Sequence, residues 1–331
     1  MGSARRRAAA AAFAALMAAP SAAASDPVRV DATPVALDAA EPERTEAGDL
    51  RFRGGLALTS PDPRFGGISG FVVSADGSRF RAVTDIGYWL TGTLGHDTGQ
   101  LVAVGDVAIA PLRDPEGNSV AGSKRRGDAE ALAVMPDGSV LVAFERVHRI
   151  WRYRLDPADD AARAEPVIMP EALERARDNG GLEALAVLPS GTVLAVTEAT
   201  LTVDGYIAGW RGTGADAEPL RLARIAPFDL TDLAVLPSGD LLTLERRYSP
   251  IGGVGFQLRR IPAATLAGGG PLEGDIVYRS RAGDTADNME ALAVRQTADG
   301  EIAVYVVSDD NFNPLQRTLV MMFALAPDAP R

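Results

Sequence analysis

The chain has 331 residues, 47% of them hydrophobic, and its 33 Lys and Arg against 44 Asp and Glu give a formal net charge of −11. This much apolar material supports a sizeable core and excludes wholesale disorder, while the acidic balance argues against a nucleic-acid-binding protein, which needs a basic face. The sequence has no cysteine and only two histidines, so it excludes disulfides, thiolate nucleophiles and cysteine-bound zinc, and it disfavours a histidine-rich metal site.

The first 24 residues have the pattern of a signal peptide. Residues 5–7 are arginines, residues 8–19 are an apolar run, and Ala22 and Ala24 form a small-x-small cleavage pattern. The run is too short for a membrane span, which needs ~20 apolar residues. We therefore expect a periplasmic or secreted protein that starts near Ser25 and has no membrane attachment after cleavage. The sequence leaves general and twin-arginine export open. Cleavage would leave 30 basic and 44 acidic residues, a net charge of −14.

Residues 25–48 are rich in Pro, Ala and acidic residues, and they predict a leader segment with one short strand around Val28–Val30. No later stretch has the composition of a linker. The simplest division is a single domain over residues 49–331, for which we favour a monomer.

One pattern occurs five times in this domain, at residues 66–85, 127–146, 180–198, 229–246 and 287–310. Each copy contains a short apolar strand, a tight turn and a second β-rich run. The turns contain Gly77, Gly138, Gly191, Gly239 and Gly300, a residue type that readily takes the positive φ of a hairpin. A buried helix is the alternative for Ala-Leu-Ala-Val, but short apolar runs that end at Pro or Gly favour strands.

Further strands are expected after each copy. They are Gly87–Leu94 and Leu101–Leu112, Arg149–Arg154 and Pro166–Met169, Tyr206–Trp210 and Pro219–Ala223, Phe256–Ile261 and Asp275–Arg279, and finally Arg317–Leu325. The fifth group is one strand short, and Arg51–Thr59 can supply that strand and close a ring. We predict an all-β fold, a β-propeller of five four-stranded blades closed by an N-terminal strand, with a sixth, diverged blade as the alternative.

Polar residues mark the start of the first strand and the end of the second strand in each copy. These ends lie side by side because the two strands are antiparallel neighbours. If the first strands line the axis, one mouth of the channel gathers Ser69, Glu130, Glu183, Asp232 and Glu290 from the starts and Asp85, Glu145, Glu198, Glu245 and Asp309 from the ends. Crowded carboxylates raise one another's pKa unless a cation compensates, and this many oxygen ligands favour Ca²⁺. The alternative is structural, with acids that join blades or pair with Arg146 and Arg246.

Five further features of the sequence are candidates for a functional role beside these acids. His148 is a candidate general acid or a plain surface histidine, and His96, in a Gly-rich loop, is expected to be exposed. The basic residues 124–126 either meet an anionic substrate or form a solvated loop. Residues 308–313 are rich in oxygen ligands but lack the spacing of an EF-hand. Ser69 lacks the Gly-x-Ser-x-Gly frame of a hydrolase nucleophile, which argues against a serine hydrolase.

Several segments also match the pattern of a known family, in order. They are FGGISGFVVSADGSRFRAVTDIG, then GDAEALAV and GLEALAV with VAFER and VTE, and finally DNMEALAV with VVSDDNFNPLQRTLVMMFAL. On these segments, residues 50–326 resemble the bacterial phytase-like domain proteins, often described as having "esterase-like activity of phytase". The resemblance implies a β-propeller related to calcium-dependent phytases, which hydrolyse phosphate monoesters of inositol phosphates.

The resemblance further implies that the mouth acids face metal and substrate, with Glu183 and Glu290 as catalytic candidates and Ca²⁺ as cofactor. Bound cation would offset the repulsion between an acidic mouth and a densely anionic substrate. Candidates to contact phosphate oxygens are Arg146, Arg149, Arg246 and Arg247. We expect an exported hydrolase of a small anionic or ester substrate. Two alternatives stay open: a non-catalytic metal- or ligand-binding propeller, and a Ca²⁺-dependent lactonase or carboxylic ester hydrolase with an amide ligand from Asn179, Asn288 or Asn311.

Overall fold

The computed structural model describes residues 25–155, 162–174, 180–249 and 252–326. The expected signal peptide, residues 1–24, and the amide candidate Asn179 lie outside the described residues. Within the described ranges, no helix combines the length and apolar character that a membrane crossing requires.

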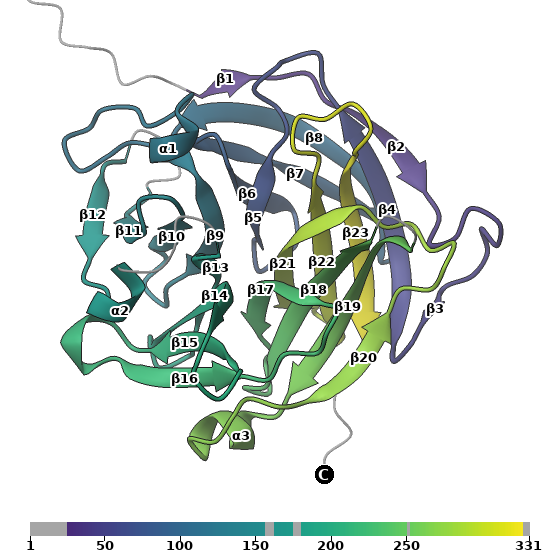
Figure 1. The fold of residues 1–331 in the computed structure, drawn as a ribbon. Helices are drawn as coiled ribbons and strands as arrows, with labels where there is room; N and C mark the ends of the chain where they lie inside the picture. Colours follow the sequence, from purple (N-terminus) through teal and green to yellow (C-terminus); the bar gives the residue numbers. More distant parts are fainter. Residues whose placement is uncertain (1–24, 156–161, 175–179, 250–251, 327–331) are drawn as a thin grey trace, which may run out of the picture.

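Five antiparallel sheets stand around a central axis as the blades of a β-propeller (Figure 1). From the axis outward, the strands of blade 1 are β5 (Ile68–Val73), β6 (Arg79–Thr84), β7 (Tyr88–Asp97) and β8 (Gln100–Pro111). Blade 2 has β9 (Ala129–Val134), β10 (Val140–Phe144), β11 (Arg149–Tyr153) and β12 (Ala164–Val167). Blade 3 has β13 (Leu182–Val187), β14 (Val193–Leu201), β15 (Ile207–Arg211) and β16 (Glu218–Leu222).

Blade 4 contains β17 (Asp229–Val235), β18 (Leu241–Ser249), β19 (Gly253–Ile261) and β20 (Asp275–Arg279). Blade 5 contains β21 (Asn288–Gln296), β22 (Ile302–Asp309) and β23 (Thr318–Leu325) from the end of the chain, followed by β4 (Leu50–Thr59) from its beginning. The pairing of β4 with β23 closes the ring, for example at Ala57 opposite Leu319. The prediction of five blades closed by an N-terminal strand is confirmed, and the six-bladed alternative is not formed.

The segment before β4 clasps the seam between blades 1 and 5. β1 (Asp26–Pro27) pairs with β8, and β2 (Asp31–Val35) pairs with β4; β3 (Glu46–Ala47) also pairs with β4. The strand expected around Val28–Val30 is therefore replaced by two strands on either side of it. Val28 and Val30 instead pack against the apolar cluster between blades 5 and 1.

Apolar clusters between neighbouring blades hold the ring together. Trp89 of blade 1 meets Tyr153 of blade 2 edge to face, with ring centroids 5.2 Å apart. Phe323 of blade 5 contacts Phe256 of blade 4 in the same manner, at 6.5 Å. Short helices lie in the connections: α1 (Lys124–Gly127), α2 (Glu171–Glu174), the 3₁₀ turn η1 (Gly214–Asp216) and α3 (Ala263–Ala267). Burial of the aliphatic and aromatic side chains in these clusters is the main attraction between blades.

The five predicted hairpin glycines all adopt positive φ, between 78° and 89°. At Gly77 the guanidinium of Arg295 in blade 5 also lies close, 2.5 Å from where a β-carbon would stand. The turn signal in the sequence therefore reports real backbone geometry.

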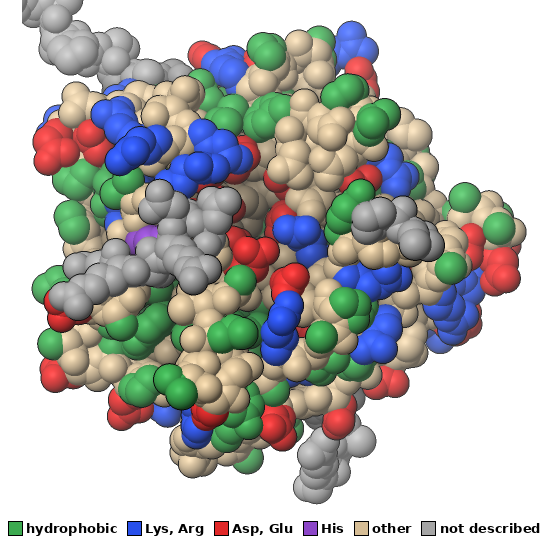
Figure 2. All heavy atoms as spheres, in the orientation of Figure 1, with side chains coloured by type: hydrophobic (Ala, Val, Ile, Leu, Met, Phe, Trp, Pro, Cys, Tyr) green, Lys and Arg blue, Asp and Glu red, His purple; other side chains and the backbone are tan. Residues whose placement is uncertain are grey.

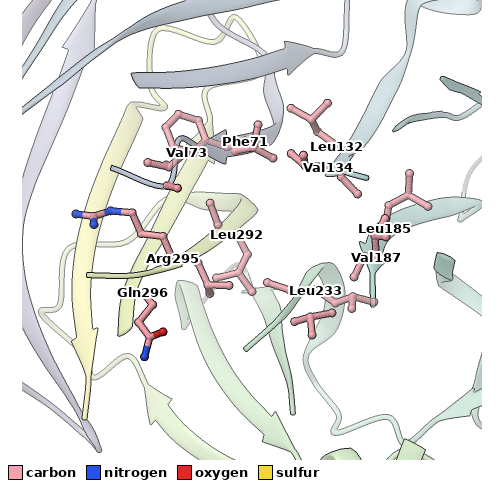
Figure 3. A pocket seen from close by; sticks show the side chains of 18 residues that line it. Phe71, Val73, Leu132, Val134, Leu185, Val187, Leu233, Leu292, Arg295 and Gln296 are labelled. Carbon is pink, nitrogen blue, oxygen red and sulfur yellow. The ribbon is translucent and has the colours of Figure 1, made fainter. Parts of the chain in front are cut away.

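The inner strands enclose a channel of about 530 Å³ (Figure 3). Four of them line it with the same Leu-Ala-Val triplet, and β5 lines it with Phe-Val-Val. The acids at the strand starts lie at one end of this channel, and the valines that end the triplets lie toward the other.

Candidate functional site

Every inner strand begins with a β-bulge. The pairing of the first strand with the second skips one residue in each blade, namely Ser69, Glu130, Glu183, Thr231 and Glu290. A bulge frees the extra residue from the alternation of the strand and redirects its side chain. Four of these five residues line one cavity at the mouth of the channel: Ser69, Glu130, Glu183 and Glu290.

In blade 4 the residues that correspond to the acids of the other blades differ by one position from those expected from the sequence. Thr231, not Asp232, occupies the position of Glu130, and Leu230 pairs with Glu245 as Ala129 pairs with Phe144. The residue after that pair is Arg246, which is therefore the counterpart of Glu145. Blade 4 thus places a hydroxyl and a cation where other blades place acids.

The two displaced acids hold the fold together. Asp232 accepts hydrogen bonds from the backbone N–H groups of Leu233 at 2.8 Å and of Leu292 in blade 5 at 2.7 Å. Glu245 forms a fully buried ion pair with Arg259, at 2.5 Å, and accepts a hydrogen bond from Gln257 at 2.6 Å. Neither acid lines the cavity. For Asp232 and Glu245, the alternative of a structural role, in joining blades or pairing with arginine, is therefore the correct one.

The cavity itself has a volume of about 110 Å³. Acidic side chains surround the mouth at the centre of the face drawn in Figure 2. The cavity is lined by carboxylates from four blades, two cations, an amide and a hydroxyl. The residues are Ser69, Asp85, Lys124, Glu130, Glu183, Arg246, Glu290, Asp309 and Asn311. Five of the nine acids proposed from the sequence are in this set, so the repeat does bring together side chains that are far apart in the chain.

Three carboxylates on the blade 2 side of the mouth are arranged to hold a metal ion. One oxygen from each of Asp128, Glu130 and Glu145 lies within 4.8 Å of the other two. Glu145 also accepts hydrogen bonds from the backbone N–H groups of Gly180, at 2.7 Å, and Gly181, at 3.0 Å, which fixes its orientation.

Asp128 was not anticipated from the sequence. The corresponding residues of the other copies are Gly67, Gly181, Asp229 and Asn288, so only one further copy has an acid there and the repeat gives a weak signal. The signal that points to it is the burial of an acid directly before the bulge. Asp128 Oδ1 is buried and accepts no hydrogen bond from the described residues, and the same holds for Asp85 Oδ1. Such oxygens are available to a cation.

Burial and mutual repulsion raise the pKa values of four acids that line the cavity, Glu130, Glu183, Glu290 and Asp309. Burial, then the charges of Glu183 and Asp128, hold the pKa of Glu130 well above its ordinary value. Burial and the charge of Glu198 do the same to Glu183. Burial raises the pKa of Glu290 to about 7, against the opposing charge of Arg246, and burial together with Asp85 raises the pKa of Asp309 to about 8. The site favours added positive charge, either protons or a metal ion.

Three cations compensate the acids only in part. Lys124 Nζ lies 2.5 Å from Asp85 and 3.6 Å from Asp128, and Arg146 pairs with Asp128. Arg246 lies between blades 3 and 5, with Nε 3.1 Å from Glu290 and Nη2 3.8 Å from Glu198. Within the described residues, no ion pair reaches Glu130 or Glu183.

The other proposed substrate-binding residues lie off the cavity. Arg149 stacks over Phe144, with its guanidinium carbon 3.9 Å from the ring centroid, and donates to the carbonyl of Val147. Arg247 donates to the carbonyl of Gly252 at 3.3 Å. Asn288 donates to Glu290 at 2.7 Å and so supports a cavity acid without lining the cavity.

The two histidines also occupy defined positions. His148 is half-buried against Gly181, where a β-carbon would lie 2.1 Å from its ring. His96 is half-buried rather than exposed, and its Nε2 lies 3.1 Å from the hydroxyl of Tyr305. That hydroxyl belongs to a neighbouring blade, and His96 lies near the end of strand β7 rather than in the Gly-rich loop expected from the sequence.

Backbone strain gathers at the mouth. Of the non-glycine residues with positive φ, Arg146 (56°) carries an ion pair to Asp128, Asn311 (48°) lines the cavity, and Phe312 (51°) follows it. The carboxylate of Asp309 accepts a hydrogen bond from the N–H of Asn311 at 2.7 Å and stabilises this conformation. Strained residues of this kind are typical of functional sites.

The fold and the site define a five-bladed β-propeller with an acidic cavity at one mouth of its channel. The chain belongs to the Phytase-like family, described as "esterase-like activity of phytase", whose sequence model matches residues 63–312. The match covers all five repeats up to Phe312. Among curated proteins, none matches this chain.

Solved structures of other propellers are similar in fold. A gluconolactonase from Xanthomonas campestris is 11% identical, with 92% of this chain and 98% of that chain covered and a TM-score of 0.40. Virginiamycin B lyase from Staphylococcus aureus is 10% identical, with 84% and 100% covered and a TM-score of 0.42. A PQQ-bound aldose sugar dehydrogenase from Streptomyces coelicolor is 14% identical, with 90% and 99% covered and a TM-score of 0.43. No activity follows from likeness at this level.

Proposed function

We propose that this protein is an exported hydrolase of phosphate esters that depends on a divalent metal ion, Ca²⁺ in the first instance. The observation that carries the proposal is the approach of carboxylate oxygens from Asp128, Glu130 and Glu145 to within 4.8 Å of one another. Membership of a family described by the esterase-like activity of phytase supports the reaction class. A small anionic ester is the expected substrate, and the monomer is the expected state.

The donor set fits a hard cation. Every candidate ligand is an oxygen, and Ca²⁺ takes six to eight oxygen ligands. Asp128 and Asp85 each offer a buried oxygen that accepts no hydrogen bond within the described residues. Glu130 and Glu183 would lose their mutual repulsion on metal binding, which is a favourable contribution to affinity. Asn311 adds an amide at the cavity wall.

A bound divalent cation supplies a Lewis acid that polarises phosphoryl oxygens and lowers the pKa of water. The residues of the chain then have separate tasks. Arg246, which lines the cavity from blade 4, is placed to contact an anionic oxygen of the ester. Glu290, with a pKa of about 7, is suited to accept or donate a proton near neutral pH. Glu183 is the second candidate for proton transfer.

Turnover assays with and without metal test this proposal. p-Nitrophenyl phosphate, p-nitrophenyl acetate and a simple lactone are each offered to the chelator-treated protein and to the protein with added Ca²⁺. We expect hydrolysis of the phosphate ester only with Ca²⁺. Phosphatase activity that survives chelation refutes the metal mechanism, and turnover of the acetate or lactone alone reassigns the substrate class. Metal binding without turnover of any substrate identifies a binding module.

A substitution assigns the activity to the cavity. Glu130→Gln is expected to weaken Ca²⁺ binding by about tenfold or more and to reduce turnover, since it removes one of the three carboxylates proposed to hold the metal ion. Glu218→Gln, on the exposed edge strand β16, is the matched control and should change neither. Equal behaviour of the two variants would place the metal elsewhere.

Export is part of the proposal and rests on the sequence of residues 1–24. We expect the mature protein, recovered from the periplasm or the medium, to begin near Ser25. N-terminal sequencing measures this directly, and an intact first residue would refute it.

A further inference from the structure

Blade 2 contains a second cavity, between the 112–123 connection, α1 and β11. Its volume is about 240 Å³, and its apolar walls are Pro115, Val120, Val147 and Trp151. We call this cavity the blade-2 pocket. It lies on the same face as the mouth, because α1 carries Lys124 into the acidic cavity and Arg126 into this pocket. Its size suits one ring-sized group, since sites for whole drug-sized molecules run from ~300 Å³ upward.

One guanidinium group that lines the pocket, that of Arg149, has no carboxylate counter-ion among the described residues. The guanidinium carbon of Arg149 lies 3.9 Å from the ring centroid of Phe144 and 4.2 Å from that of Trp151. Its Nη1 donates to the carbonyl of Val147 at 2.7 Å, and its Nη2 donates to the carbonyl of Arg126. Among the residues that the structure describes, no carboxylate forms an ion pair with it. Burial lowers the pKa of Arg149 to about 10, so a nearby anion would be stabilising.

A second cation stands at the rim. Arg126 is exposed, and its Nη2 donates to the carbonyl of Ser119 at 2.6 Å. In the described part of the chain, no carboxylate forms an ion pair with Arg126 either. Two guanidinium groups that share one small pocket favour a planar anion such as a carboxylate, which accepts parallel hydrogen bonds from arginine.

The acids of the pocket limit the ligand to one charge. The carboxylate of Asp114 already has partners within its own loop. It accepts hydrogen bonds from the backbone N–H of Asn118 at 2.7 Å and from Nδ2 of Asn118 at 3.3 Å. Glu116 is exposed beside it and lines the same pocket. A polyanion would meet these two charges, whereas a monoanion with an apolar body would place only that body near them.

We propose that the blade-2 pocket binds a small monocarboxylate that carries an aromatic ring. The carboxylate would lie at Arg126 and Arg149, and the ring against Trp151 and Val147, because aromatic rings stack on guanidinium and indole surfaces. Nothing in this proposal depends on the hydrolase reaction at the mouth, so the failure of one leaves the other standing.

Calorimetric titration of the full mature chain with benzoate tests the ligand class. We expect saturable binding that is about tenfold or more tighter than binding of benzamide, which keeps the ring without the charge, since hydrogen bonds to charged groups are the stronger kind. Acetate, which keeps the charge without the ring, and inorganic phosphate should bind at least tenfold more weakly than benzoate. Equal affinity for benzamide or phosphate, or no saturable benzoate binding, would overturn the proposal.

Matched variants test the location. Arg126→Ala should weaken benzoate binding about tenfold, while Arg125→Ala, its exposed neighbour outside the pocket, should not. Val147→Asp should abolish binding, while Val102→Asp should not; these two valines are 44% and 48% exposed, so the substitutions are equally tolerable for the fold. Benzoate binding that ignores Arg126→Ala and Val147→Asp would place the site elsewhere, with unchanged thermal unfolding as the check that each variant is folded.

Discussion

The acids at the mouth should make the metal-free protein less stable as the pH rises. Glu290 has an ordinary pKa of 4.5, and burial raises it to about 7 despite the opposing charge of Arg246. Between these values the folded protein keeps a proton that the unfolded chain has released. The free energy of unfolding therefore falls as the pH rises through this window, and the full shift corresponds to about 3 kcal/mol.

The variant Glu290→Gln isolates this contribution. Urea unfolding is measured in chelator at pH 5 and pH 8, for the wild-type protein and the variant. The wild-type protein also contains Asp309, Glu130 and Glu183, whose pKa values are raised as well, so the informative quantity is the difference in pH dependence between the two proteins. We expect the variant to lose about 2.5 kcal/mol less than the wild-type protein between the two pH values.

The control is Glu218→Gln, an exposed glutamate on β16, which should leave the pH dependence unchanged. Added Ca²⁺ at pH 8 should restore stability to the wild-type protein, because a cation then takes the place of the missing protons. If the wild-type protein and Glu290→Gln have the same pH dependence in chelator, then Glu290 is not a buried, crowded acid and the description of the cavity fails.

Three further predictions concern other parts of the molecule. Glu245→Gln should lower the free energy of unfolding by about 3–5 kcal/mol in urea titrations, because it leaves Arg259 buried without its partner, yet it should leave Ca²⁺ affinity unchanged; a loss of affinity would return Glu245 to the metal site. Arg246→Met should tighten Ca²⁺ binding several-fold by calorimetry, because it removes a competing cation from Glu198 and Glu290, and weaker binding would contradict this. Deletion of residues 25–35, which removes β1 and β2, should lower Tm by several degrees in a thermal scan, and an unchanged Tm would show that the clasp adds nothing to ring closure.

Much of the fold was predictable because local signals repeat. Each hairpin glycine marks a turn, and each Ala-Leu-Ala-Val run marks an inner strand, so the spacing of the copies predicted the blades. The closing strand at residues 51–59 followed from a missing strand in the last blade. The clasp of β1 and β2 did not follow, because edge strands of two and five residues carry almost no periodic signal.

The site was less predictable than the fold. Acids at Glu130, Glu183 and Glu290 were found because each stands at the same place in its copy. In blade 4 the nearest acids, Asp232 and Glu245, are each one residue out of register. Counting from the Pro-Ser-Gly turn at 237–239, back to the first strand and forward along the second, selects Thr231 and Arg246.

By itself, the amino-acid sequence determined the propeller, the number of its blades and the end of the channel at which carboxylates gather, because these depend on repeated local patterns. Only the tertiary structure decided which carboxylates face one another. A single bulged residue changes the direction in which a side chain points. Glu130 is itself the bulged residue of its blade and lines the cavity, whereas Asp232 follows the bulged residue Thr231 and accepts a hydrogen bond from the next blade. Asp128 joins Glu130 through the tertiary structure, since among the other copies only the fourth, at Asp229, has an acid at this position.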